Sequence, residues 1–154
     1  MKKLLTLALV ASAFVFGTQN AQAQTYKTGA GLMIDLGDGA TLVGPHVKHF
    51  FSGNNAGEFS LLFGGKATTI QALYQYNKNF SGTSGLMWYV GAGPAISFGD
   101  GDTAFSIVPV AGLDYKISGA PLDLFFDWRP RIIISDNNSD FLAGRFGLGA
   151  RFTF

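Results

Sequence analysis

The sequence predicts an all-β protein, an eight-stranded antiparallel transmembrane β-barrel that follows a cleaved signal peptide. Three observations lead to this prediction. A secretory signal opens the chain, the remainder alternates between apolar and polar residues with a period of two, and the charged residues inside the alternating segments share one parity. Charge on one face and apolar side chains on the other are typical of a barrel with a polar interior and a lipid-facing exterior.

The first 23 residues have the parts of a Sec signal peptide. Lys2 and Lys3 precede an apolar run over residues 4–16, and Ala21-Gln22-Ala23 supplies a cleavage site with small residues. The apolar run is too short for a membrane anchor, because a bilayer core is ~30 Å thick. We therefore divide the chain into a signal peptide at residues 1–23 and one barrel domain at residues 24–154.

The composition excludes several classes of protein. Without Lys2 and Lys3, nine of the 11 basic residues remain against ten acidic ones, so no charge excess favours nucleic acid. The absence of cysteine excludes disulfides, thiolate metal sites and a lipoprotein anchor. No apolar run of about 20 residues follows the signal, so no transmembrane helix is expected. The 21 glycines and the 14 % aromatic content favour short strands and tight turns.

The first four predicted strands cover residues 26–36, 41–51, 57–63 and 68–77. Gly37-Asp38-Gly39 is a hairpin turn signal between the first two. In each segment successive side chains alternate between two faces, and the side chains on the outward face are apolar or aromatic. The inward sets of these four strands include Asp35, His46, Lys48, Glu58, Gln71 and Gln75.

The fifth and sixth predicted strands cover residues 86–98 and 104–117. Trp88 and Tyr115 fall on their outward parity, and Asp114 falls on the inward parity. Glycines are concentrated on the inward parity of the fifth strand, where a narrow barrel needs small residues.

The seventh and eighth predicted strands cover residues 122–134 and 144–154. The inward parity carries Asp127, Arg129 and Arg131 in the seventh strand, and Arg145 and Arg151 in the eighth. The outward residues of the last strand end on an aromatic residue, a pattern that resembles the signal for insertion of bacterial outer-membrane barrels. The residues of this predicted insertion signal are Phe146, Leu148, Phe152 and Phe154.

Four prolines, Pro45, Pro94, Pro109 and Pro130, fall within predicted strands, where each removes a backbone donor. We interpret these positions as bulges or weakened strand pairings.

A soluble barrel such as a lipocalin is the alternative, and it would bury the apolar face instead. The signal peptide, the glycines on the polar face and the aromatic residues favour the membrane version. Aromatic residues gather at the strand ends that are periplasmic if the amino terminus is periplasmic, as an interfacial girdle does. The predicted girdle includes Tyr26, Tyr74, Tyr76, Trp88 and Tyr115.

Six segments carry a resemblance to a known family. They are Val47-Lys48-His49-Phe50-Phe51, Asn55-Ala56-Gly57-Glu58, Ala72-Leu73-Tyr74-Gln75-Tyr76, Trp88-Tyr89-Val90-Gly91-Ala92-Gly93, Gly112-Leu113-Asp114-Tyr115 and residues 121–130. In their order and spacing the chain resembles the small outer-membrane β-barrel proteins of Bacteroidota, a family largely without assigned activity. The resemblance implies the barrel fold and an outer-membrane location, and it implies no catalytic or ligand residues.

The inward charges predict a network of ion pairs, because an unpaired charge away from water is costly. The predicted network comprises Asp35, Lys48, Glu58, Asp114, Asp127, Arg129, Arg131, Arg145 and Arg151. Eight strands leave an interior that side chains nearly fill, so we expect an occluded lumen.

These features favour a structural or accessory component of the cell envelope. Passage or binding of a small molecule in the lumen is the second hypothesis. A lipid-modifying enzyme is the third, raised by His46 and His49, but no serine is placed convincingly beside His49, so we predict no enzyme. The predicted external connections are short, which disfavours an adhesin.

No cofactor or metal site is predicted. Residues 99–102 lack the ligand spacing of a calcium loop, and residues 64–66 lack the upstream glycine of a phosphate-binding loop. The expected partners are outer-membrane lipid, lipopolysaccharide and the insertion machinery. No nucleic acid is expected to bind, and the sequence does not identify which proteins, if any, are partners.

Overall fold

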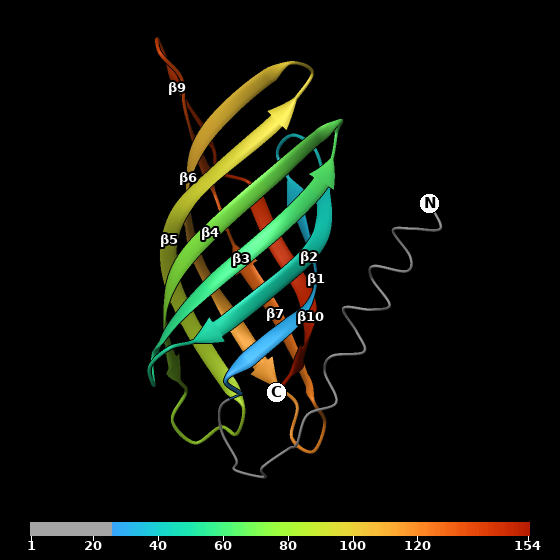
Figure 1. Ribbon diagram of the computed structural model, residues 1–154. Helices are drawn as coiled ribbons and strands as arrows, with labels where there is room; N and C mark the ends of the chain where they lie inside the picture. The colour runs from blue at the N-terminus through green and yellow to red at the C-terminus, as the bar shows by residue number, and fades with distance from the viewer. Residues whose placement is uncertain (1–25) are drawn as a thin grey trace, which may run out of the picture.

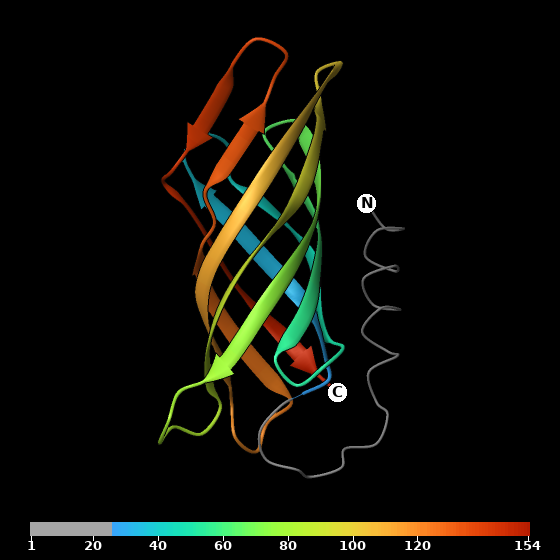
Figure 2. The same cartoon turned by 90° about the vertical axis from the view of Figure 1, so that its left-hand side faces the viewer.

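Ten strands form one antiparallel sheet that closes on itself in the computed structural model, which describes residues 26–154 (Figures 1 and 2). The predicted signal peptide lies outside the described residues. The strands are β1 (Thr28–Gly37), β2 (Leu42–Phe50), β3 (Asn55–Gly64), β4 (Ala67–Asn79), β5 (Leu86–Gly99), β6 (Asp102–Lys116), β7 (Leu122–Trp128), β8 (Arg131–Ile134), β9 (Ser139–Leu142) and β10 (Arg145–Thr153).

Each strand from β1 to β6 pairs with the next, β6 pairs with β7, β7 with β10, and β10 with β1. The short strands β8 and β9 continue the seventh and eighth walls as a hairpin. The prediction of a closed, eight-stranded antiparallel barrel is therefore confirmed. Within the described residues no helix is both long and apolar enough to cross a membrane.

Tight turns close the strand pairs at one end of the barrel, which we call the turn end. Gly65-Lys66 joins β3 to β4 and Asp100-Gly101 joins β5 to β6, and all four residues have positive φ, between 48° and 84°. Positive φ at both central residues is the geometry that matches the twist of a hairpin. The opposite end, where Thr28 and Phe154 exchange backbone hydrogen bonds, is the terminal end.

The seventh wall is divided where two prolines stand opposite each other. Ala111 pairs with Trp128 and Ile107 pairs with Ile132, so the shared register sets Pro109 against Pro130. Neither proline has a backbone N–H, and the pairing lapses between β7 and β8. The single seventh strand predicted over residues 122–134 is thus two strands.

The ladder also lapses at the other two mid-strand prolines. The β2–β3 register passes from Val43 directly to His46, which leaves Pro45 out, and the β4–β5 register omits Pro94. On the β1 and β6 sides, Pro45 and Pro94 remain paired with Leu32 and Ile107.

A β-bulge divides the eighth wall at the same height. Phe146 pairs with Trp128 on one side of the bulge, and Leu142 pairs with Arg131 on the other. Two residues of the seventh wall therefore face the three residues 143–145. One extra residue reverses the side-chain parity, so that β9 is out of phase with β10.

Burial alternates along the strands, as a barrel with two unlike faces requires. Leu32 on β1 is 63 % exposed, whereas Asp35 on the same strand is fully buried. The exposed charged residues within strands, Lys78, Asp102 and Asp140, lie at a strand end or next to one. The outer face of the barrel is therefore apolar between its ends.

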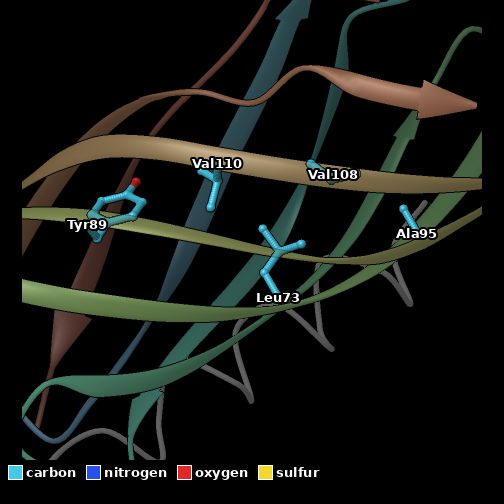
Figure 3. Packing of buried hydrophobic residues seen from close by; sticks show 5 residues of the cluster. All are labelled: Leu73, Tyr89, Ala95, Val108 and Val110. Carbon is cyan, nitrogen blue, oxygen red and sulfur yellow. The ribbon is translucent and has the colours of Figure 1, made fainter. Parts of the chain in front are cut away.

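The inner wall has an apolar sector on three neighbouring strands, β4, β5 and β6. Figure 3 shows its five residues, Leu73, Tyr89, Ala95, Val108 and Val110, close to one another on these strands. Apart from Asp114 on β6, the buried charged side chains come from the other strands and from the β7–β8 connection.

Candidate functional site

The interior of the barrel holds ten buried charged side chains, five carboxylates and five cations. They are Asp35, Glu58, Asp114, Asp123 and Asp127, and Lys48, Arg129, Arg131, Arg145 and Arg151. All nine residues of the predicted network lie inside, together with Asp123. Because acidic and basic residues are equal in number, the formal charges of the buried set balance.

The lower cluster, nearest the terminal end, consists of Lys48, Asp114, Asp123 and Arg151. Asp114 Oδ2 lies 2.8 Å from both Lys48 Nζ and Arg151 Nη2, and Arg151 Nε donates to Asp123 Oδ2 at 2.7 Å. Lys48 also donates to Asn77 Oδ1 at 2.6 Å. The four charges balance, and they join β2, β6, β7 and β10 across the interior.

The middle cluster consists of Glu58, Asp127 and Arg129, and it carries one excess negative charge. Arg129 Nη1 lies 3.2 Å from Glu58 Oε1, and Arg129 Nε donates to Asp127 Oδ1 at 2.5 Å. Two uncharged side chains donate hydrogen bonds to these carboxylates. Tyr89 donates to Asp127 Oδ2 at 2.5 Å, and the Gln75 amide donates to Glu58 Oε2.

The upper cluster, nearest the turn end, consists of Asp35, Arg131 and Arg145, and it carries one excess positive charge. Asp35 accepts from Arg145 Nη2 at 2.9 Å and from Arg131 Nη2 at 3.1 Å. Arg145 also donates to the backbone oxygens of Asp38 and Ala40. One carboxylate therefore serves two guanidinium groups.

His46 lies between the lower and middle clusters in a geometry that does not suit a general base. Arg151 Nη1 lies 2.7 Å from His46 Nε2, and a guanidinium can only donate, so Nε2 is the acceptor and Nδ1 carries the proton. Nδ1 faces Ser60 Oγ at 2.9 Å, and the Ser60 hydroxyl donates to Met33 Sδ. In this tautomer His46 cannot take the proton of Ser60.

His49 lies on the other parity of β2 and is exposed, with Nδ1 2.8 Å from Thr28 Oγ1. Within the described residues no group of three or more His, Cys, Asp or Glu side chains is arranged to hold a metal ion.

The assignment of Tyr26 to an outward aromatic girdle is wrong. Tyr26 is buried, and its hydroxyl donates to Asp114 Oδ2 at 3.0 Å and lies 3.3 Å from Asp123 Oδ2. Burial raises the pKa of this phenol well above its ordinary value, which keeps the donor proton in place. Tyr26 precedes β1, so the alternation of that strand does not govern its side chain.

The alternation of the first predicted strand places Lys27 on the inward parity, but Lys27 precedes β1 and is exposed. Lys116 is half-buried at the end of β6, where its ammonium donates to the backbone oxygens of Ile117 and Ala120.

The other four predicted girdle residues lie on the outer surface toward the terminal end. Tyr74, Tyr76 and Tyr115 are exposed and Trp88 is half-buried. The rings of Tyr76 and Trp88 lie 6.1 Å apart, and the Tyr74 hydroxyl donates to Asn55 Oδ1 at 2.5 Å.

A second group of exposed aromatic residues, near the turn end, was not anticipated. It includes Phe63, Phe98, Phe105 and Phe141. Each lies within four residues of a turn, and this spacing is the signal in the sequence that could have identified the group. The predicted insertion residues Phe146, Leu148, Phe152 and Phe154 are all exposed on the outer face.

The sequence-level comparisons return nothing: no protein-family model and no curated protein matches the chain. Solved structures share the fold. The N-terminal β-barrel domain of Pseudomonas aeruginosa OprF superposes with a TM-score of 0.63 at 19 % identity and covers 86 % of this chain and 100 % of its own.

Two further structures match in the same way. A de novo designed transmembrane β-barrel gives a TM-score of 0.61 at 14 % identity, covering 86 % of this chain and 100 % of its own. Neisserial surface protein A (NspA) gives 0.54 at 17 % identity, covering 87 % and 100 %. What this chain shares with all three is the eight-stranded barrel fold.

Proposed function

We propose that the protein is an integral outer-membrane β-barrel with an occluded, ion-paired interior, and that it serves as a structural or accessory component of the envelope. The observation that carries the proposal is the neutral set of five carboxylates and five cations inside the barrel. Paired charges of this kind tie the walls together across the space that a solute would need.

The outer face supports a membrane location. It is apolar between the strand ends, and aromatic residues lie toward both ends of the barrel, as in proteins that cross a bilayer with strands. The similar solved barrels include outer-membrane proteins of other bacteria. The resemblance to small Bacteroidota barrels belongs to this proposal as well.

The route to the membrane is part of the same proposal. Residues 1–23 act as a Sec signal peptide, and the insertion machinery recognises the outward residues of β10 with Phe154. Outer-membrane lipid and lipopolysaccharide then surround the apolar face.

Planar-bilayer recording of the refolded barrel tests the occluded interior. Wild type should give no steady conductance, because Arg129 and Arg151 are fully buried among their acids. Reproducible openings of wild type, with an ion selectivity that changes in Arg129→Ala or Arg151→Ala, would overturn the proposal and favour solute passage. Heat-modifiable gel migration of the same samples verifies that the recorded protein is a folded barrel.

A further inference from the structure

The inward residues at the turn end surround a cavity of about 170 Å³. Two arginines, Arg131 and Arg145, line it together with the hydroxyl residues Thr69, Ser97 and Ser106. The rest of its lining is small or aliphatic. The cavity thus combines positive charge with hydroxyl groups in a space that protein atoms do not fill.

The positive charge at this cavity is not neutralised locally. Asp35 is the only carboxylate paired with Arg131 and Arg145 in the described chain. The middle cluster carries one excess negative charge, but its carboxylates already accept hydrogen bonds within that cluster. Glu58 accepts from Arg129 and Gln75, and Asp127 accepts from Arg129 and Tyr89. Among the described residues one cation at the turn end therefore has no ion-pair partner of its own, and the exposed carboxylate of nearby Asp38 accepts from the Gly144 N–H instead.

Arg131 has capacity left for a ligand. Arg145 donates to Asp35 and to two further backbone oxygens, whereas Arg131 makes one hydrogen bond, from Nη2 to Asp35. Its Nε is buried and has no partner among residues 26–154. A buried guanidinium N–H without an acceptor has lost its hydration without a replacement, so an acceptor that entered the cavity would relieve this cost.

A second unpartnered group lies beside the cavity. Gln71 is buried, and neither its amide nitrogen nor its amide oxygen has a partner in the described chain. The pairings Gln71–Ala95, Ala95–Ser106 and Ser106–Ile133 place Gln71 in the same row across the sheet as two residues that line the cavity. The row that contains Ser106 and Ile133 thus offers a further donor.

We propose that this cavity binds a small oxyanion, a phosphate or carboxylate group, through Arg131. The guanidinium fork matches two oxygens of such a group. The hydroxyl of Ser106 supplies an additional donor, and so does one hydroxyl of the hydrogen-bonded pair Thr69 and Ser97. The volume corresponds to about five or six water molecules at ~30 Å³ each. The cavity therefore has room for the phosphate or carboxylate group only. This group is either a free anion or part of a larger molecule whose remainder stays outside the cavity. This inference goes beyond the envelope role and does not depend on it.

Nuclear magnetic resonance of the refolded barrel in detergent micelles tests the site directly. The probe is inorganic phosphate, exchanged for chloride at constant ionic strength, and the readout is the Nε–H resonance of Arg131. We expect a shift that saturates with phosphate. In Ala104→Leu, which fills the cavity and keeps every charge, the shift should disappear. Lys66→Gln removes an exposed cation at the same end and should leave the shift unchanged.

Arg131→Gln provides a second measurement, read from the backbone amide of Ser106. The phosphate-dependent shift of the Ser106 amide should be lost in Arg131→Gln. A shift that never saturates in wild type, or one of equal size in Ala104→Leu, would overturn the proposal and leave the cavity to water.

Two further titrations identify the source of the anion. If lipopolysaccharide shifts the Arg131 resonance and its dephosphorylated form does not, the phosphate belongs to a lipid. If only inorganic phosphate or acetate has an effect, the ligand is a free small anion. Both results support the site.

Discussion

Arg129 and Glu58, 71 residues apart in the sequence, meet inside the barrel with Nη1 3.2 Å from Oε1. Arg129 extends from the connection between β7 and β8, and Glu58 from β3 across the interior. The pair therefore links two walls that share no backbone hydrogen bonds.

Glu58→Ala should lower the free energy of unfolding by about 1.5–3 kcal/mol, because Arg129 keeps Asp127 but loses the charged hydrogen bond to Glu58. Urea titration of the barrel in lipid vesicles measures the change. Asp136→Ala, in the exposed turn between β8 and β9, is the control and should stay within about 0.5 kcal/mol of wild type. Equal unfolding midpoints for the two variants would contradict an energetic role for the pair.

Tyr89→Phe should lower the free energy of unfolding by about 1–3 kcal/mol. The substitution deletes the hydroxyl that donates to Asp127 Oδ2, so this buried oxygen loses one of the hydrogen bonds that replace its hydration. Tyr115→Phe makes the same chemical change on the exposed face and serves as the control. Unfolding curves under identical conditions compare them, and a loss in Tyr115→Phe as large as that in Tyr89→Phe would argue against this explanation.

Gly147→Ala tests whether the glycines of the inner face make room for the ion pairs. A Cβ at Gly147 would lie 2.4 Å from Arg129 Nε and 2.6 Å from Asp127 Oδ1, so one of these side chains must move. Overpacking of this kind typically costs about 1–3 kcal/mol. Gly53→Ala, where no atom lies within 4 Å of the new Cβ, should be neutral. A neutral Gly147→Ala variant would mean that the middle cluster tolerates displacement.

Ile107→Arg tests the lipid-facing surface. On a face buried in lipid, an arginine near mid-strand should cost about 2–4 kcal/mol, whereas Thr103→Arg, on the same face of β6 close to its end, should cost about 0–1 kcal/mol. The difference is measured in vesicles and again in detergent. The same cost at both positions would count against a bilayer around this face.

The face of most residues could be predicted from the sequence because strand alternation is a local property. The alternation correctly separates Leu32 from Asp35 and Val47 from Lys48. It fails at Tyr26, which precedes the first paired residue and turns inward to reach Asp114.

The pairing of the charges could not be read in the same way. Which acid meets Arg129 or Arg151 depends on the stagger of strands around the closed ring, and no local pattern encodes that stagger. The break between β7 and β8 is similar, because it requires knowing that Pro109 faces Pro130. The second aromatic group does follow a local pattern, because Phe63, Phe98 and Phe105 each lie within four residues of a turn.

The opposed prolines separate the β8–β9 hairpin from the continuous backbone pairing of the ring. Backbone pairing with Phe105, Ser106 and Ile107 of β6 and the ion pair between Arg131 and Asp35 hold the hairpin to the barrel, and the far edge of β9 is unpaired among the described strands. If the hairpin detaches from β6, the ring of β1–β7 and β10 stays closed, because β7 pairs with β6 and with β10 on the terminal side of the bulge. The amide protons of the hairpin should exchange with solvent sooner than those of β1 or β10. Since Arg131, Ile133 and Leu142 lie on this hairpin and also line the cavity, opening of the hairpin would expose the cavity to solvent along one side.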